Sequence, residues 1–155
     1  MADTPGSRLL LIVTGSSLRA EEVDRPLAYY LKKQVEQQLL ALGPEAEDLR
    51  VMVVSDLRWI HDEVLQQLPT ISIGGPGVNM LAHRWLEELP LSLAVDEQYY
   101  LQMDPEIEEL KASVWGMDNP TTQIAVSAFI QSLLLRFLDR CVTDAPDTID
   151  LDDED

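Results

Sequence analysis

The sequence predicts an α/β fold, a Rossmann-like three-layer sandwich with a mostly parallel sheet, helices on both of its faces and an antiparallel extension. Two observations carry this prediction. Short apolar runs alternate with segments of helical periodicity as far as Pro90, and short strands follow one another after that residue. Alternation with short connections is typical of parallel strands joined by right-handed helical crossovers.

The first part of the chain repeats strand and helix three times. Runs of apolar and β-branched residues predict buried strands at 9–13, 51–54 and 70–73. Apolar residues at helical spacing predict helices at 21–42, about 59–68 and 78–89. The first of these helices is expected to end at Gly43-Pro44, because these residues stop a helix.

The pattern changes after Pro90. Shorter strands are predicted at 91–95, 98–103 and 112–115, with a turn or a single helical turn at 105–110. A last helix is expected from Asn119 to about Cys141, because Asp118 or Asn119 is a good N-cap and Pro120 suits the first helical turn.

Length and composition indicate one α/β domain, residues 1–142, followed by an acidic tail, residues 143–155. A chain of 155 residues with 46% hydrophobic and 25% charged residues has the size and apolar content of a single globular domain. Acidic residues dominate from Asp144 to Asp155, where no basic residue occurs, and we expect this segment to be disordered.

The charge limits the classes of binding partner, and the cysteine content limits disulfides and metal sites. The formal net charge is −17, from 11 basic and 28 acidic residues, and argues against nucleic acid and anionic membrane surfaces as partners. Cys141 is the only cysteine, so no disulfide within the chain and no multi-cysteine zinc site is expected. No metal site is predicted, and the sequence leaves the question of a cofactor open. Without a signal-peptide pattern or a bilayer-length apolar helix, a cytoplasmic protein is expected.

A ligand site is expected at the carboxyl ends of the parallel strands, where open α/β sheets bind their ligands. The candidate ligand-binding residues at this edge are Gly15, Ser16, Ser17, Arg19, Asp56, Gly74, Gly75, Gly77 and Asn79.

The strongest candidate is the turn Gly74-Gly75-Pro76-Gly77. Its glycines let the backbone approach a ligand, and the helix that follows offers unpaired N–H groups to a phosphate or carboxylate. Packing of a tight strand-to-helix turn explains the same glycines, and Pro76 removes one donor.

Three side chains near the other strand ends are further candidates, and two of them have a second interpretation. Arg19 is a candidate partner for an anion, because guanidinium binds two oxygens at once. Asp56 can accept hydrogen bonds from ribose hydroxyls or act as a helix N-cap. Ser16 offers a hydroxyl to a phosphate or belongs to an ordinary small-residue turn.

Two short pairs of motifs resemble known families. Ile73-Gly74-Gly75-Pro76-Gly77-Val78-Asn79, followed by Val114-Trp115-Gly116-Met117-Asp118, resembles the Gly-Gly-Pro…Asn units of archaeal surface-layer-type domains, which implies a structural role. Gly15-Ser16-Ser17, together with the glycine turn and Met80, is loosely similar to Rossmann-like nucleotide-sensing families related to lysine-decarboxylase-like phosphoribohydrolases. That resemblance implies a nucleotide-derived ligand. No catalytic residue is transferred from either family.

Three functions remain open at this point. The first is a non-catalytic module that senses a small anionic or nucleotide-derived ligand or binds a partner protein. The second is a hydrolase or transferase acting on a nucleoside or nucleotide, with Asp56, His61 or Glu63 in acid–base roles. The third is a structural subunit of a homo-oligomer that uses Trp85 and the pair Tyr99-Tyr100 at its interface.

Overall fold

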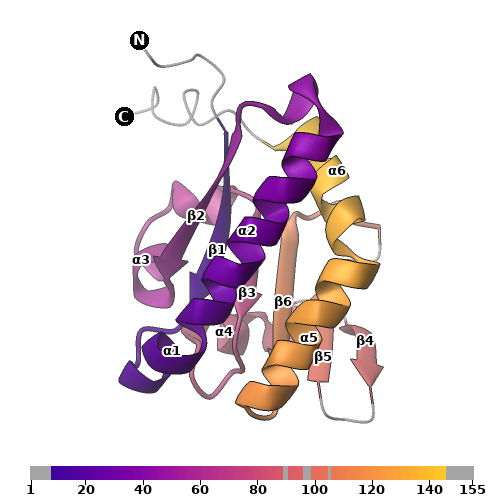
Figure 1. Ribbon diagram of the computed structural model, residues 1–155. Helices are drawn as coiled ribbons and strands as arrows, with labels where there is room; N and C mark the ends of the chain where they lie inside the picture. The colour runs from indigo at the N-terminus through magenta and orange to yellow at the C-terminus, as the bar shows by residue number, and fades with distance from the viewer. Residues whose placement is uncertain (1–7, 89–90, 96–98, 105, 146–155) are drawn as a thin grey trace.

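The computed structural model describes residues 8–88, 91–95, 99–104 and 106–145. Within these residues one sheet has the strand order β2-β1-β3-β6-β5-β4 (Figure 1). The strands are β1 Arg8–Thr14, β2 Leu49–Ser55, β3 Thr70–Ile73, β4 Leu91–Val95, β5 Tyr99–Met103 and β6 Lys111–Gly116. Strands β2, β1, β3 and β6 are parallel, and β5 runs antiparallel to both β6 and β4. The α/β class and the antiparallel extension are confirmed.

Helices cover both faces of the sheet. They are α1 Leu18–Val23, α2 Arg25–Leu42, α3 Asp56–Ile60, α4 Met80–Glu88, α5 Asn119–Ser132 and α6 Leu134–Asp144, with short 3₁₀ turns at Pro44–Ala46 and Leu65–Gln67. Helices α2, α5 and α6 lie on one face and α3 and α4 on the other (Figure 1). The predicted three-layer arrangement is therefore present.

Two predicted helices are broken by local chemistry. The helix predicted at 21–42 is two helices, because Pro26 stands in the first turn of α2 and has no N–H to continue the hydrogen bonds of α1. The helix predicted at 59–68 is α3 and a 3₁₀ turn. Between them Asp62 accepts hydrogen bonds from the backbone N–H groups of Val64 at 3.0 Å and Leu65 at 3.3 Å, which competes with the helical pattern.

The last predicted helix is also divided, at Leu133, where α5 and α6 meet at a bend of 63°. The bend lets α6 bury Phe137 and Leu138 against the sheet. Helix α6 continues to Asp144, so the predicted domain boundary at 142/143 falls inside a helix; the rest of the predicted tail, 146–155, lies outside the described residues. In the part of the chain described, no single helix is long and apolar enough to cross a membrane, and α5 with α6 passes that test only as a bent pair.

The face under α3 and α4 has its own small core. Trp59 and Trp85 meet there edge to face, with ring centroids 5.6 Å apart, and Trp85 is 1% exposed. The prediction that Trp85 lies at an oligomer interface is therefore wrong, because its ring is buried in this core. Tyr99 and Tyr100 lie on β5, which is paired with β6 on one side and with β4 on the other, so they do not form an edge of the sheet.

At the amino ends of the parallel strands, Arg8 joins three parts of the chain. Its guanidinium makes two hydrogen bonds to the Asp48 carboxylate, at 2.9 and 2.8 Å. It also donates to the carbonyl oxygens of Val142 at 2.6 Å and Glu45 at 3.3 Å. The end of α6 is thereby fixed to the beginning of the sheet.

Stability is expected to fall in acid through Asp48. The hydrogen bond and charge of Arg8 lower the pKa of this carboxyl, so its contribution is complete above the unfolded pKa of about 4 and is lost as pH falls through the lower folded pKa. Urea titrations from about pH 6 down to about pH 3 should show a falling midpoint, with a weaker pH dependence in Asp48→Asn. An equal slope in both proteins would contradict this assignment.

Candidate functional site

The carboxyl ends of the parallel strands meet at a topological switch point. From β1 the chain continues to β2 on one side, whereas from β3 it continues through α4 to β4 on the other side, so the turns after β1 and β3 diverge. These turns lie with α1 and the start of α5 at the lower edge of the sheet in Figure 1.

The turn after β3 is compact. Gly74 has a φ of 108°, which favours glycine, and a Cβ there would lie 2.7 Å from Oδ2 of Asp24. The carbonyl oxygen of Gly75 accepts hydrogen bonds from the backbone N–H groups of Val78 at 3.1 Å and Asn79 at 3.0 Å. The turn thus uses two of the N–H groups that the sequence assigned to a ligand.

The first turn of α4 has its N–H groups paired within the protein. Oδ1 of Asn79 accepts from the N–H groups of Leu81 at 2.9 Å and Ala82 at 3.2 Å. The N–H of Met80 donates to Oδ2 of Asp56 at 2.8 Å. A carboxylate of the protein therefore occupies the place where an external anion was predicted.

Asn79 itself is 1% exposed. Its amide nitrogen donates to the carbonyl of Ile73 at 2.9 Å, to Oγ of Ser72 at 3.0 Å and to the carbonyl of Val13 at 3.4 Å. The predicted ligand residue Asn79 instead joins the ends of β1 and β3 to α4.

Asp56 and Ser16 form a pair between two strand ends. Ser16 Oγ donates a hydrogen bond to Oδ1 of Asp56, whose side chain is buried. The N-cap of α3 is Ser55, so Asp56 stabilises the start of α4 rather than of its own helix. Ser17 caps α1 by accepting from the N–H of Ala20 at 3.1 Å. The side chain of Arg19 lies outside the described part of the structure.

The turns after β1 and β3 touch through their backbones. A Cβ on Gly15 would lie 1.8 Å from the carbonyl oxygen of Val78, so only glycine allows this approach. The single crevice expected from the sequence is consequently divided into two cavities, which share Pro76, Gly77 and Val78 as a wall.

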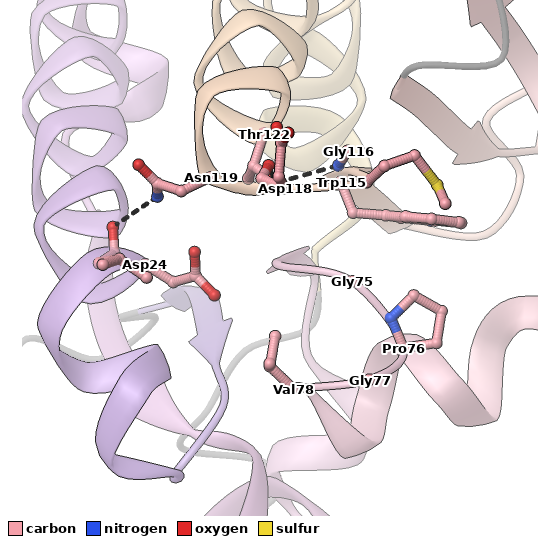
Figure 2. A pocket seen from close by; sticks show the side chains of 12 residues that line it. Asp24, Gly75, Pro76, Gly77, Val78, Trp115, Gly116, Asp118, Asn119 and Thr122 are labelled. Carbon is pink, nitrogen blue, oxygen red and sulfur yellow. Dashed lines mark hydrogen bonds between the residues drawn. The ribbon is translucent and has the colours of Figure 1, made fainter.

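The first cavity, called the tryptophan cavity, has a volume of about 310 Å³ (Figure 2). It is lined by Val23, Asp24, Gly75, Pro76, Gly77, Val78, Trp115, Gly116, Met117, Asp118, Asn119 and Thr122. The second, called the serine cavity, has about 510 Å³. It is lined by Ser16, Ser17, Asp56, Leu57, Ile60, Pro76, Gly77, Val78, Asn79, Met80 and His83.

The indole ring of Trp115 is held in a fixed orientation. It stacks on Tyr100 with centroids 4.5 Å apart and an interplanar angle of 32°. Its Nε1 donates to Oε1 of the buried Gln102 at 3.0 Å. Figure 2 shows the ring edge-on across the cavity from Gly75 and Pro76. Trp115 is not among the candidate ligand-binding residues predicted from the sequence, although its place beside Gly116 at a strand end was an available signal.

The start of α5 lies beside Trp115 and Gly116, across the cavity from Gly77 and Val78 (Figure 2). Asp118 accepts from the N–H of Thr121 at 2.9 Å and closes a capping box, and these bonds lower the pKa of its carboxyl. The N–H of Gly116 donates to Oγ1 of Thr122 at 3.0 Å. Asn119 donates from its side chain to the carbonyl of Val23 at 3.2 Å, which links α5 to α1 (Figure 2).

The acid–base residues proposed for an enzyme do not converge. Asp56 lines the serine cavity, whereas His61 and Glu63 are exposed and line neither cavity. Among the residues that the structure describes, no group of three His, Cys, Asp or Glu side chains is arranged to hold a metal. Burial raises the pKa of the Cys141 thiol far above neutrality, so this side chain is not a nucleophile.

Comparison with known proteins adds no family to this picture. No protein-family model matches the chain, and no curated protein matches it either. The two resemblances to known families stay predictions. The geometry of the two cavities is the remaining evidence on function.

Proposed function

We propose that this protein is a non-catalytic ligand-sensing module that holds a small molecule in the tryptophan cavity. The observation that carries the proposal is a cavity of about 310 Å³ with a fixed aromatic wall at the carboxyl edge of a parallel sheet. Small-molecule sites are typically concave, at least this large and placed at such edges.

The chemistry of the walls favours a ligand with a flat or apolar body. Trp115 offers a ring for stacking, and Val78 adds apolar surface opposite. The N–H groups expected to cradle a phosphate are paired with Gly75, Asn79 and Asp56. A nucleotide-derived ligand would therefore place its base in this cavity, with its phosphate outside.

Binding is favoured over catalysis because the polar groups at this edge already have internal roles. Asp56 caps α4, Asp118 caps α5, and Ser17 caps α1. The hydrogen bonds from Thr121 lower the pKa of the Asp118 carboxyl and stabilise its ionised form, which opposes proton transfer near neutral pH.

A thermal-shift and calorimetric screen with nucleosides, nucleotides, amines and acidic metabolites tests the proposal. Two exposed methionines provide a matched pair of blocking variants, since Met117 lines only the tryptophan cavity and Met80 only the serine cavity. We expect a bound ligand whose affinity falls at least about ten-fold in Met117→Trp and stays within about two-fold in Met80→Trp.

Two results would count against the proposal. One is a screen without any ligand that shifts the melting temperature of the wild-type protein. The other is a ligand lost in Met80→Trp and retained in Met117→Trp, which would move the site to the serine cavity.

We also propose a cytoplasmic location. The chain has one cysteine and therefore needs no oxidising compartment for a disulfide. Fractionation of cells that express the tagged protein checks this, and recovery in a secreted or membrane fraction would refute it.

A further inference from the structure

We propose that the ligand of the tryptophan cavity is a small organic cation, a protonated amine carried on an apolar or aromatic body. This inference rests on the proposed function and adds the charge of the ligand. The lining residue Asp118 carries an exposed carboxylate, and none of the described lining residues is Lys, Arg or His. Electrostatics inside the cavity therefore favours positive charge.

The starts of α4 and α5 do not supply an anion site. At α5 the N–H of Thr121 donates to the Asp118 carboxylate, and the N–H of Thr122 donates to the Asp118 carbonyl. At α4 the Asp56 carboxylate accepts from Met80. An incoming anion would meet a carboxylate of the protein at each helix start, whereas a cation would be attracted to it.

Asp118 keeps its charge near neutral pH. The backbone N–H and the hydroxyl of Thr121 both donate to its carboxylate, and they hold its pKa below the ordinary value. The side chain is exposed, so its oxygens retain lone pairs that a ligand ammonium group can approach from the cavity.

Trp115 supplies the second attraction. The face of an indole ring is electron-rich and binds alkylammonium groups, with a contribution of about 0.5–2 kcal/mol. Stacking on Tyr100 and the hydrogen bond to Gln102 fix the ring before a ligand arrives. An aromatic wall beside the Asp118 carboxylate suits one chemical class, an amine on a hydrophobic body.

The charge of the whole protein acts in the same direction. A net charge of −17 attracts cations and repels anions beyond the cavity, and salt weakens this effect. Binding should therefore become weaker as ionic strength rises.

Three probes with the same ring and different charge test the inference: benzylamine, benzyl alcohol and benzoate. Calorimetry on the full chain at pH 7 should rank the affinities in that order. We expect the ammonium form of benzylamine to bind at least about ten-fold more tightly than benzyl alcohol, and benzoate to bind most weakly.

Asp118→Asn separates charge from structure, because Asn is also a good N-cap and the start of α5 should persist. We expect this variant to reduce the preference for benzylamine over benzyl alcohol about three-fold or more. Glu47→Gln, which removes an exposed charge away from the cavity, is the matched control and should leave the preference unchanged.

Three outcomes overturn the inference. They are equal or tighter binding of benzyl alcohol or benzoate, an unchanged preference in Asp118→Asn, and no binding of any of the three probes. If a neutral ligand binds in the screen and Met117→Trp abolishes its binding, the inference that the ligand is a cation is refuted, and the proposed function stands. Failure of the whole screen would refute both.

Discussion

Asn79→Ala should lower the free energy of unfolding by about 3–5 kcal/mol. The substitution removes the N-cap of α4, which accepts from Leu81 and Ala82. It also leaves the buried carbonyl of Ile73 and the hydroxyl of Ser72 without the amide that donates to them. A loss of this size is a large part of the stability of a small domain.

Guanidinium denaturation, followed by circular dichroism, measures this effect. Asn119→Ala is the matched control, since that amide makes one donated bond, to the carbonyl of Val23, and is only half-buried. We expect Asn119→Ala to cost about 1 kcal/mol. Equal losses in the two variants would show that the bonds of Asn79 do not act as a group.

Arg8→Ala should cost about 2–4 kcal/mol. Its side chain is 13% exposed, and removal leaves the Asp48 carboxylate without its counter-charge and the Val142 carbonyl without its donor. Arg8→Lys should cost less, about 1–2 kcal/mol, because an ammonium group keeps the charge and loses the two-bond geometry.

Glu88→Gln controls for a generic loss of an ion pair. Glu88 pairs with Arg84 at 3.6 Å, and both side chains are about half exposed, so the change should stay within about 0.5 kcal/mol. If Arg8→Ala fell within the same range, the link between β1 and the end of α6 would be energetically unimportant.

The strands were predictable because their signal is local. Residues 70–73 form β3 with the bounds that the sequence indicated, since three β-branched residues within a short run between turn signals leave little alternative. The break at Asp24 was also marked in the sequence, by Pro26. The bend at Leu133 was not, because it arises from burying Phe137 and Leu138 against the distant sheet.

In the candidate site, too, the features set by local residues were predictable and those set by distant contacts were not. The glycine turn was located from its residues, yet the helix that follows it starts at Met80, whose N–H pairs with Asp56 through a bond between positions 24 residues apart. The role of Trp115 depends on Tyr100 and Gln102, which come from a neighbouring strand. Partners brought together by the sheet leave no periodic pattern in the sequence.

The Ser16–Asp56–Met80 connection joins the ends of β1 and β2 to the helix that follows β3. The conformational entropy of these loops is therefore lost when the chain folds, before any ligand arrives. Association with a ligand then requires little further ordering of the shared wall, which favours measurable affinity even for a molecule of few atoms. The protein should recognise its ligand as a preorganised receptor.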